Sequence, residues 1–187
     1  MGMPMAHHLV KNGFRTKGFD LRRSACNKFE ALGGEAVASA EEAAQNADAL
    51  VLMVVNSAQV EEVLFGSGAL NALPEHGFVV LTATCAPATV ESLAERVEAR
   101  GRRFLDAPVS GGMAGAEAGT LSIMAAGTAD VFEATHSLLA AFGGKIFHVG
   151  TRPGQGAAIK VVNQLLCGVH LAVAAEALAL AEKTGLP

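Results

Sequence analysis

The chain has 187 residues, of which 51% are apolar and 17% are charged. This composition is too apolar for a disordered chain, and the length suits one domain with a substantial core. The net charge of −4 excludes a general attraction for nucleic acid, and no uninterrupted apolar run reaches the roughly 18 residues that span a membrane. We therefore expect neither nucleic acid nor a membrane as a partner.

The cysteines and histidines show none of the spacings that indicate disulfides or metal sites. Cys26, Cys85 and Cys167 are not paired in sequence, and no secretory signal precedes them, which is typical of a reduced, cytoplasmic protein. We expect no metal, because no ligand spacing joins the histidines, which are His7, His8, His76, His136, His148 and His170.

The first half of the chain alternates between short strands and helices. Gly13 ends a helix that opens at Pro4. The apolar run at residues 49–55 predicts a strand buried on both faces of a parallel sheet, and Ser57 is expected to cap the helix that follows. The other predicted elements here are strands over 16–20 and 78–82 and helices over 24–32, 57–64 and 87–100.

The second half continues the same alternation up to residue 150. It contains predicted strands over 103–107, 121–126 and 145–149, and a helix over 129–141. Repeated alternation of strands and helices predicts an α/β fold with a doubly wound, mainly parallel sheet. We expect residues 1–150 to form this domain.

Residues 151–187 follow a different pattern. An apolar helix is predicted over 157–184 and would extend roughly 40 Å at 1.5 Å per residue. Its apolar stretch is interrupted by four polar residues, so we interpret it as a buried helix; these residues are Asn163, Gln164, His170 and Glu176. A helix this apolar needs partners on several sides, so we expect more protein after Pro187 or another subunit that covers it.

The segment at residues 106–112, Asp-Ala-Pro-Val-Ser-Gly-Gly, follows a predicted strand. Ser110, Gly111 and Gly112 offer a hydroxyl and exposed backbone N–H groups there. Together these groups form a small anion-binding nest that suits a carboxylate. An ordinary glycine-rich turn is the alternative interpretation.

A second polar cluster lies near the start of the long helix. Lys160 stands among Ala, Ile and Val, where desolvation lowers the pKa of a lysine from about 10.4. A lysine with a lowered pKa can exchange a proton with a substrate hydroxyl. Asn163 and Gln164 follow three and four residues later, so both share the face of the helix that carries Lys160. The alternative is a lysine that extends from an amphipathic helix into water.

Asp20 stands at the end of the predicted strand over 16–20. An acidic residue there can accept hydrogen bonds from both hydroxyls of an adenosine ribose and repels a 2′-phosphate. Arg22 and Arg23 favour the opposite preference, because guanidinium groups pair well with phosphate. The acidic residue predicts NAD, with NADP less favoured.

These motifs resemble those of one family, the β-hydroxyacid dehydrogenases related to 3-hydroxyisobutyrate dehydrogenase. Residues 106–112 are similar to its D-A-P-V-S-G-G substrate loop, and residues 154–164 are similar to its catalytic helix, G-x-G-x-x-x-K-x-x-N-[NQ]. The opening Met-Gly-Met-Pro-Met-Ala resembles the second half of its nucleotide fingerprint, G-x-G-x-M-G. The resemblance covers the whole chain and implies a Rossmann-like NAD-binding domain over 1–150, followed over 151–187 by a long interdomain catalytic helix.

The resemblance also implies where the cofactor binds. Gly2 corresponds to the third glycine of the fingerprint, which allows close packing of helix on strand. The first two glycines and the first strand would precede Met1, and a C-terminal helical domain would follow Pro187, so we expect a fragment of a longer protein. The other positions implied to contact NAD are Met3, Asp20, Val54, Val55, Gln59 and Thr84.

The implied reaction is reversible hydride transfer between NAD and the C3 hydroxyl of a small 3-hydroxy acid. Lys160 is expected to accept the hydroxyl proton, and Ser110 with the backbone of Gly111 and Gly112 is expected to hold the carboxylate. Asn163 or Gln164 would orient the hydroxyl.

The substrate and the whole assembly remain open at this point. Val54-Val55-Asn56 and Leu64-Phe65-Gly66 resemble the L-threonate dehydrogenase branch more than the 3-hydroxyisobutyrate branch or the 2-hydroxy-3-oxopropionate (tartronate semialdehyde) reductases. The missing helical domain closes the site and forms the dimer in relatives, which implies a homo-oligomer for the full-length protein. Two other functions stay open, a catalytically weak nucleotide-binding remnant and a scaffold without catalysis, although Lys160 argues against the scaffold.

Overall fold

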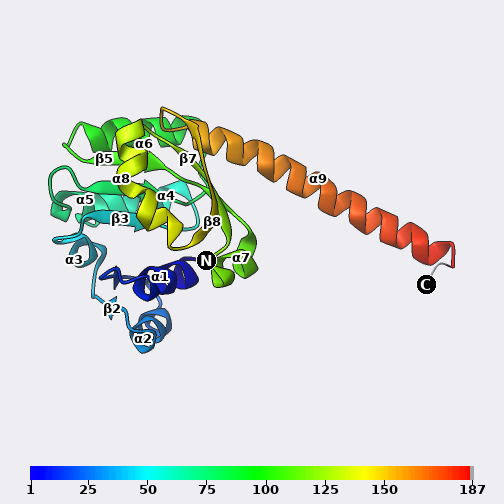
Figure 1. The fold of residues 1–187 in the computed structure, drawn as a ribbon, viewed down its shortest axis with the longest axis horizontal. Coiled ribbons are helices and arrows are strands. Elements are labelled where there is room, and N and C mark those ends of the chain that lie inside the picture. Colours follow the sequence, from blue (N-terminus) through cyan, green and yellow to red (C-terminus); the bar gives the residue numbers. More distant parts are fainter. Residues whose placement is uncertain (186–187) are drawn as a thin grey trace.

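The computed structural model describes residues 1–185, in which an α/β domain carries one long projecting helix (Figure 1). The strands are β1 (Lys17–Gly18), β2 (Glu35–Ala36), β3 (Ala49–Leu52), β4 (Phe78–Leu81), β5 (Arg103–Asp106), β6 (Val109–Ser110), β7 (Leu121–Ala126) and β8 (Gly143–Gly150). The helices are α1 (Gly2–Lys11), α2 (Arg23–Ala31), α3 (Ala40–Ala44), α4 (Ser57–Glu61), the π-helix η1 (Glu62–Gly66), α5 (Ala69–Ala72), α6 (Pro87–Glu98), α7 (Gly112–Ala118), α8 (Ala129–Ala140) and α9 (Gln155–Lys183).

The main sheet within residues 1–185 has six strands, in the order β3-β4-β5-β7-β6 with β8 paired to β7. β3, β4 and β5 are parallel, with Leu52 opposite Leu81 and Leu81 opposite Asp106. β7 runs parallel to β8 but antiparallel to β5 and β6, and β1 and β2 form a separate parallel pair. The predicted Rossmann-like α/β fold is confirmed, with an antiparallel reversal at β7 that the sequence pattern did not predict.

Helices cover both faces of this sheet and enclose two apolar cores. Side chains alternate along a strand, so Val79 and Leu81 face one core while Val80 faces the other. The first core is closed by α4, α5 and α6, and the second by α1, α7 and α8. β4 is apolar on both faces and lies between β3 and β5, as expected for a buried parallel strand.

Local details at the end of β3 differ from the prediction. The strand stops at Leu52, three residues before the end of the predicted run. Asn56, not Ser57, caps α4, because its Oδ1 accepts the backbone N–H of Gln59 at 3.0 Å and Ser57 is already helical. The predicted helix through Leu64 begins as α4 and continues as η1, in which the hydrogen bonds widen to the π-helical pattern.

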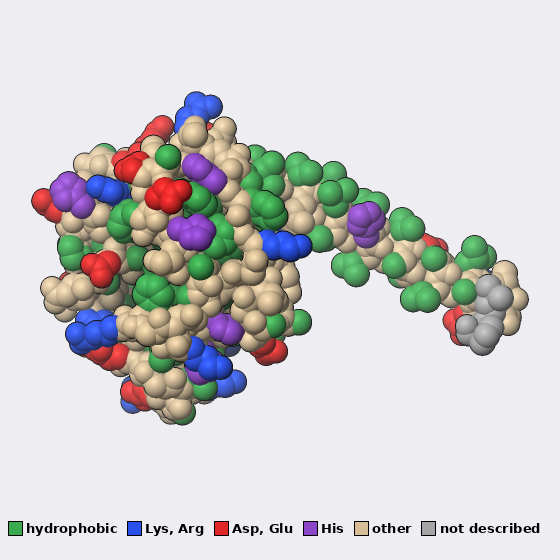
Figure 2. All heavy atoms as spheres, viewed as in Figure 1, with side chains coloured by type: hydrophobic (Ala, Val, Ile, Leu, Met, Phe, Trp, Pro, Cys, Tyr) green, Lys and Arg blue, Asp and Glu red, His purple; other side chains and the backbone are tan. Residues whose placement is uncertain are grey.

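The long helix α9 also departs from expectation. Its first turns pack on the domain, where Ala157 and Lys160 are buried. Beyond Lys160 its apolar side chains are exposed, reaching 73% at Leu171, and Figure 2 shows apolar side chains along the whole projecting part of the helix. The prediction of a buried helix is therefore wrong for the described turns beyond Lys160, since no other described segment covers them.

The same helix is long and apolar enough to cross a membrane, which the sequence analysis had not expected. The core helix of a soluble protein can pass the same test of length and composition, so the result alone is weak evidence for a membrane span. The predicted segment over 151–187 also includes Leu186 and Pro187, which lie outside the described residues.

Candidate active site

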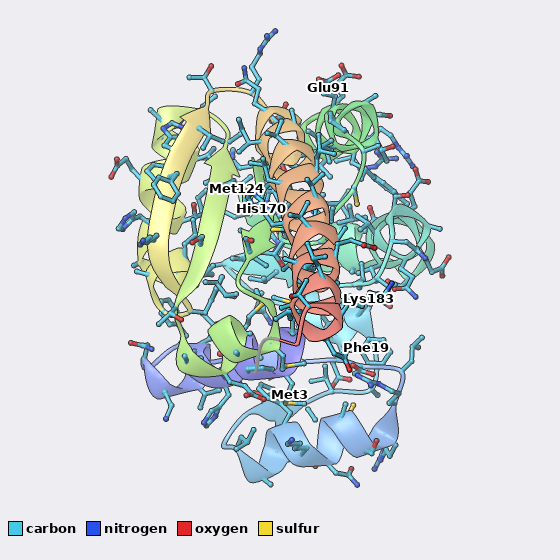
Figure 3. All side chains as sticks on the ribbon, turned by 90° about the vertical axis from the view of Figure 1, so that its right-hand side faces the viewer. Met3, Phe19, Glu91, Met124, His170 and Lys183 are labelled. Carbon is cyan, nitrogen blue, oxygen red and sulfur yellow. The ribbon has the colours of Figure 1, made fainter. Side chains whose placement is uncertain are left out.

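The first turns of α9 lie between two parts of the α/β domain. In Figure 3, which looks toward the projecting helix, β7 and β8 flank it on one side and α6 on the other, with Met124 of β7 and Glu91 of α6 as markers. The glycine Gly154 precedes the helix with a φ of 94°, and an added Cβ there would meet the side chain of Glu91. The start of α9 is thus fixed in a crevice rather than on an open surface.

Lys160 lies on the packed side of this helix and is only 5% exposed. Burial lowers the pKa of its ammonium group, while the charge of Cys167, two turns further along, acts in the opposite direction. Its Nζ donates to Oδ1 of Asn163 at 3.2 Å. The lysine therefore has the lowered pKa that the sequence analysis expected, with one polar partner at its head.

The loop after β5 reaches the same point from the other direction. Ser110 Oγ donates to Oδ1 of Asn163 at 3.0 Å, so one amide oxygen accepts hydrogen bonds from both Ser110 and Lys160. Gly111 and Gly112 continue the loop with φ values of 134° and 62° and lead into α7. Ser110 is thereby joined to Asn163, 53 positions away, and through it to Lys160.

Gln164 takes no part in this cluster. It is exposed, whereas Asn163 is half-buried and accepts both hydrogen bonds. Of the two amides that the sequence left as alternatives, the geometry favours Asn163 as the residue that orients a ligand.

Asp106, the last residue of β5, is a buried carboxylate behind this cluster. It is 1% exposed, and its Oδ2 accepts the backbone N–H groups of Gly154 at 2.9 Å and Ala157 at 2.8 Å. Burial raises the pKa of Asp106 to about 6, and the backbone N–H donors offset part of that rise. From the sequence, Asp106 was recognised only as the first residue of the motif over 106–112. Two features of the sequence could have indicated this contact. Asp106 is an acid at the end of a buried strand, and Gly154 is a glycine before a long helix.

A hollow of about 360 Å³ borders the Ser110–Asn163 pair. Its wall is mostly apolar and is formed by Ser110, Ser122, Met124, Phe147, Val149, Ile159 and Asn163. This volume suits a small organic acid whose polar end reaches Ser110 and Asn163. Within residues 1–185, no three His, Cys, Asp or Glu side chains gather where they could hold a metal ion.

The predicted cofactor residues lie at the carboxyl ends of β1, β3 and β4. Asp20, just beyond β1, is half-exposed, and its two carboxylate oxygens accept hydrogen bonds from Nε and Nη2 of Arg22 at 3.0 and 3.1 Å. These bonds lower the pKa of Asp20. Asp20, which is predicted to bind the ribose hydroxyl groups, is thus paired with Arg22, which was expected to favour a 2′-phosphate instead.

The residues after β3 and β4 are open to solvent. Val55 is 83% exposed, Val54 is half-buried against the first core, and Thr84 is exposed. Gln59 uses its Oε1 to accept the N–H of Val55 at 2.9 Å, which leaves its amide nitrogen for a ligand. A polar edge at the ends of neighbouring parallel strands is where nucleotides bind in such sheets, so these residues fit a dinucleotide.

Gly2 and Met3 begin α1 at the same edge. An added Cβ on Gly2 would lie 3.6 Å from Cβ of Met53, which is ordinary contact. Close helix-to-strand packing therefore does not by itself require glycine here, contrary to the reason given from the sequence. Met3 is half-buried and lies near this edge in Figure 3.

Comparison with known proteins agrees with this arrangement. Residues 1–150 match the model for the NAD binding domain of 6-phosphogluconate dehydrogenase, and residues 154–187 match the model for NAD-binding of NADP-dependent 3-hydroxyisobutyrate dehydrogenase. The L-threonate dehydrogenase of Cupriavidus necator is 40% identical over 187 residues, which is 100% of this chain and 63% of that protein.

Two crystal structures share the fold closely. The 3-hydroxyisobutyrate dehydrogenase of Salmonella typhimurium superposes with a TM-score of 0.92 at 38% identity, over 100% of this chain and 65% of that one. The Mycobacterium tuberculosis 3-hydroxyisobutyrate dehydrogenase with L-serine gives 0.91 at 34% identity, over 100% of this chain and 63% of that one. The chain thus spans about 63% of the length of the curated relative. It belongs to the NAD(P)-linked β-hydroxyacid dehydrogenase family, whose members include 3-hydroxyisobutyrate and L-threonate dehydrogenases.

Proposed function

We propose that this chain carries the cofactor-binding domain and the catalytic helix of an enzyme that transfers hydride between NAD and the C3 hydroxyl of a small 3-hydroxy acid. The observation that supports this most strongly is the meeting of Lys160 and Ser110 at one oxygen of Asn163. This contact brings Lys160, which can exchange a proton, together with Ser110, which can bind a carboxylate. The names of the relatives suggest L-threonate or 3-hydroxyisobutyrate as the substrate.

The roles of the residues follow from their chemistry. Bound NAD would supply the hydride chemistry, accepting the hydride from C3 of the hydroxy acid or returning it there. Lys160 takes the proton of the substrate hydroxyl as the carbonyl forms, and its burial favours the neutral amine that can do so. Ser110, with the backbone N–H groups of Gly111 and Gly112, holds the carboxylate, and Asn163 keeps Lys160 oriented.

The proposed cofactor is NAD rather than NADP. Asp20 presents a carboxylate at the end of β1 that can accept ribose hydroxyl groups and repels a 2′-phosphate. The domain over residues 1–150 is proposed to bind this cofactor, with Gly2, Met3, Val54, Val55, Gln59 and Thr84 lining it.

The exposed face of α9 supports a further part of this proposal. Side chains such as Leu165, Leu171 and Leu178 are between 67% and 73% exposed, which is unfavourable in water. We propose that protein, in a homo-oligomer, covers this face rather than a membrane. The first turns of the helix are already tied to a dehydrogenase domain, and a cytoplasmic setting fits the free thiols of Cys26, Cys85 and Cys167.

Replacement of the lysine tests the proposal. In Lys160→Ala, turnover of L-threonate or 3-hydroxyisobutyrate with NAD should fall by a factor of about 10²–10⁴, while the affinity for NAD stays within about twofold. Lys183→Ala, which removes an exposed lysine at the far end of α9, is the matched control and should keep full turnover. NADH formation and NAD titration measure the two effects.

The remaining outcomes distinguish the alternatives. Saturable NAD binding without turnover of any hydroxy acid would favour the nucleotide-binding remnant. Consumption of NADH with 2-hydroxy-3-oxopropionate alone would assign the chain to the reductase branch instead. Undiminished turnover in Lys160→Ala would refute the proposed role of the lysine.

A further inference from the structure

The long helix α9 begins without a cap of its own. Gly154 stands at its N-cap position and has no side chain to accept a hydrogen bond from the first turn. The backbone N–H groups at the start of any helix have no partners within the helix, and in a buried setting they need an acceptor from elsewhere. The first turn of α9 is buried at Gly156 and Ala157, so water cannot serve.

Asp106 supplies the missing acceptor from a different element. Its Oδ2 accepts the N–H of Gly154, the N-cap residue, at 2.9 Å, and the N–H of Ala157, the third residue of the helix, at 2.8 Å. These are the two donors that a capping box satisfies with two side chains of the helix itself. Here one carboxylate oxygen at the end of β5 satisfies both, across 48 and 51 residues of chain.

Close packing holds the helix against this carboxylate. A Cβ added to Gly156 would lie 2.5 Å from the backbone oxygen of Met124 and 3.0 Å from two oxygens of Asp106. The first turn of α9 therefore presses directly on the ends of β5 and β7. It can neither shift along its axis nor turn without losing these contacts.

The carboxylate also lies between the two halves of the proposed site. Ala157, which it holds, is three residues before Lys160, slightly less than one helical turn. On the other side, Ser110 follows Asp106 by four residues and contacts Asn163. Lys160 is thus three residues from a backbone N–H that Asp106 binds, and Ser110 is four residues from Asp106 itself.

We propose that Asp106 is a positioning residue, whose carboxylate caps α9 from outside the helix and so fixes Lys160 against Asn163 and the Ser110 loop. The inference rests on the proposed function for its catalytic meaning, but its geometry can be tested without a substrate. A buried carboxylate is an expensive group to keep for stability alone, because its desolvation offsets much of what its hydrogen bonds contribute. Its effect is therefore expected mainly in the placement of α9.

Two substitutions at this position separate placement from folding. Asp106→Ala removes both acceptor oxygens, whereas Asp106→Asn keeps the shape and one acceptor oxygen. The matched control is Asp130→Asn, which makes the same change at an exposed acid in the first turn of α8. All three are compared with the parent chain by amide hydrogen exchange and by the pH dependence of Lys160 acetylation, both followed by mass spectrometry.

In Asp106→Ala, exchange of the amides over residues 154–160 should become about tenfold faster, as expected for the loss of a cap. The acetylation midpoint of Lys160 should move up toward that of a free lysine, because the loosened turn admits water. Asp106→Asn should show a smaller change in the same two measurements, and Asp130→Asn should change neither. The partial effect of the asparagine is the conservative rescue that a positioning role requires.

An unchanged acetylation midpoint in either folded Asp106 variant would overturn the proposal. If Asp106→Ala does not fold, the comparison of Asp106→Asn with Asp130→Asn decides it. These outcomes are independent of the enzyme assay. Full turnover in Lys160→Ala would refute the proposed function while a shifted Lys160 midpoint in the Asp106 variants would still establish the cap.

Discussion

The proposed catalytic side, around Lys160, and the proposed cofactor side, around Asp20 and Gln59, hold their polar groups in different ways. Around Lys160, hydrogen bonds join residues about 50 positions apart, and Asp106 and Lys160 are almost completely buried. At the cofactor edge, Asp20 and Gln59 bond to residues two and four positions away and remain accessible to solvent. Contacts between distant segments position the groups around Lys160, whereas contacts between residues close in sequence position Asp20 and Gln59.

This difference indicates how each side meets its ligand. The catalytic groups already have their mutual geometry, which reduces the reorganisation needed when a substrate arrives. The cofactor groups have partners that a ligand must displace or share, most clearly the oxygens of Asp20 that Arg22 occupies. Perturbations should therefore be large on the catalytic side and small at the cofactor edge.

The largest expected effect is that of Gly156→Ala. The added methyl group would overlap the backbone oxygen of Met124, which cannot rotate away, so we expect the free energy of unfolding to fall by ~3 kcal/mol or more. Gly168→Ala on the same helix is the control, because its Cβ would meet open space, and it should stabilise by up to ~1 kcal/mol. Urea unfolding measures both, and equal effects would contradict the described packing of α9.

The pH dependence of stability should reveal the buried acid. Because the folded-state pKa of Asp106 is raised to about 6 from 3.8, the folded chain binds this proton more tightly than the unfolded chain. The contribution of this group is fully present below pH 3.8 and is lost as pH rises to about 6, a change of roughly 3 kcal/mol. Asp106→Asn should remove this slope in unfolding measured across that range.

The contribution of Asp20 to stability should change with pH in the opposite sense to that of Asp106. Arg22 lowers its pKa, so its contribution is present above the ordinary value and is lost as pH falls through the lowered one. The pair is exposed, and its effect should be hard to detect. If the pH dependence of the free energy of unfolding disappears in Asp20→Asn and not in Asp106→Asn, our expectation that the buried acid causes the large effect is wrong.

A further test concerns the proposed carboxylate site. In Ser110→Ala, the KM for the hydroxy acid should rise by about 10- to 100-fold, the usual loss for a hydrogen bond to a charged group. The affinity for NAD should not change. Ser122→Ala removes a hydroxyl from the same hollow at a position outside the Ser110–Asn163 pair, so its effect on KM should be smaller. A reversed order would place the carboxylate elsewhere in the hollow.

The smallest effect is expected at the cofactor edge. Arg22→Ala removes the guanidinium from both oxygens of Asp20 and leaves only the backbone N–H of residue 22 on Oδ1, so NAD should bind more tightly, by less than about fivefold for an exposed ion pair. Arg23→Ala, one residue along, should leave NAD affinity unchanged. Weaker NAD binding in Arg22→Ala, measured by fluorescence or calorimetric titration, would show that the arginine itself contacts the cofactor.

Much of the sheet was predictable because its strands are continuous apolar runs. β4, β5 and β7 lie within one residue of the predicted ranges. Short elements such as β6 and α7 were not predicted, since two to seven residues are too few for a period to emerge. The burial of α9 was predicted wrongly because an apolar helix indicates that a partner must cover it but does not show which segment does so.

The sequence by itself determined the alternation of the α/β fold, the family, and which motifs carry polar chemistry, because these depend on local composition and spacing. The tertiary structure alone decided that Asn163 rather than Gln164 meets Ser110, and that Asp106 caps a helix whose N-cap residue is 48 positions away. Each of these contacts depends on how distant segments pack against one another. Hydrogen-bond partners across such distances are chosen by how strands and helices are stacked, which no local pattern records.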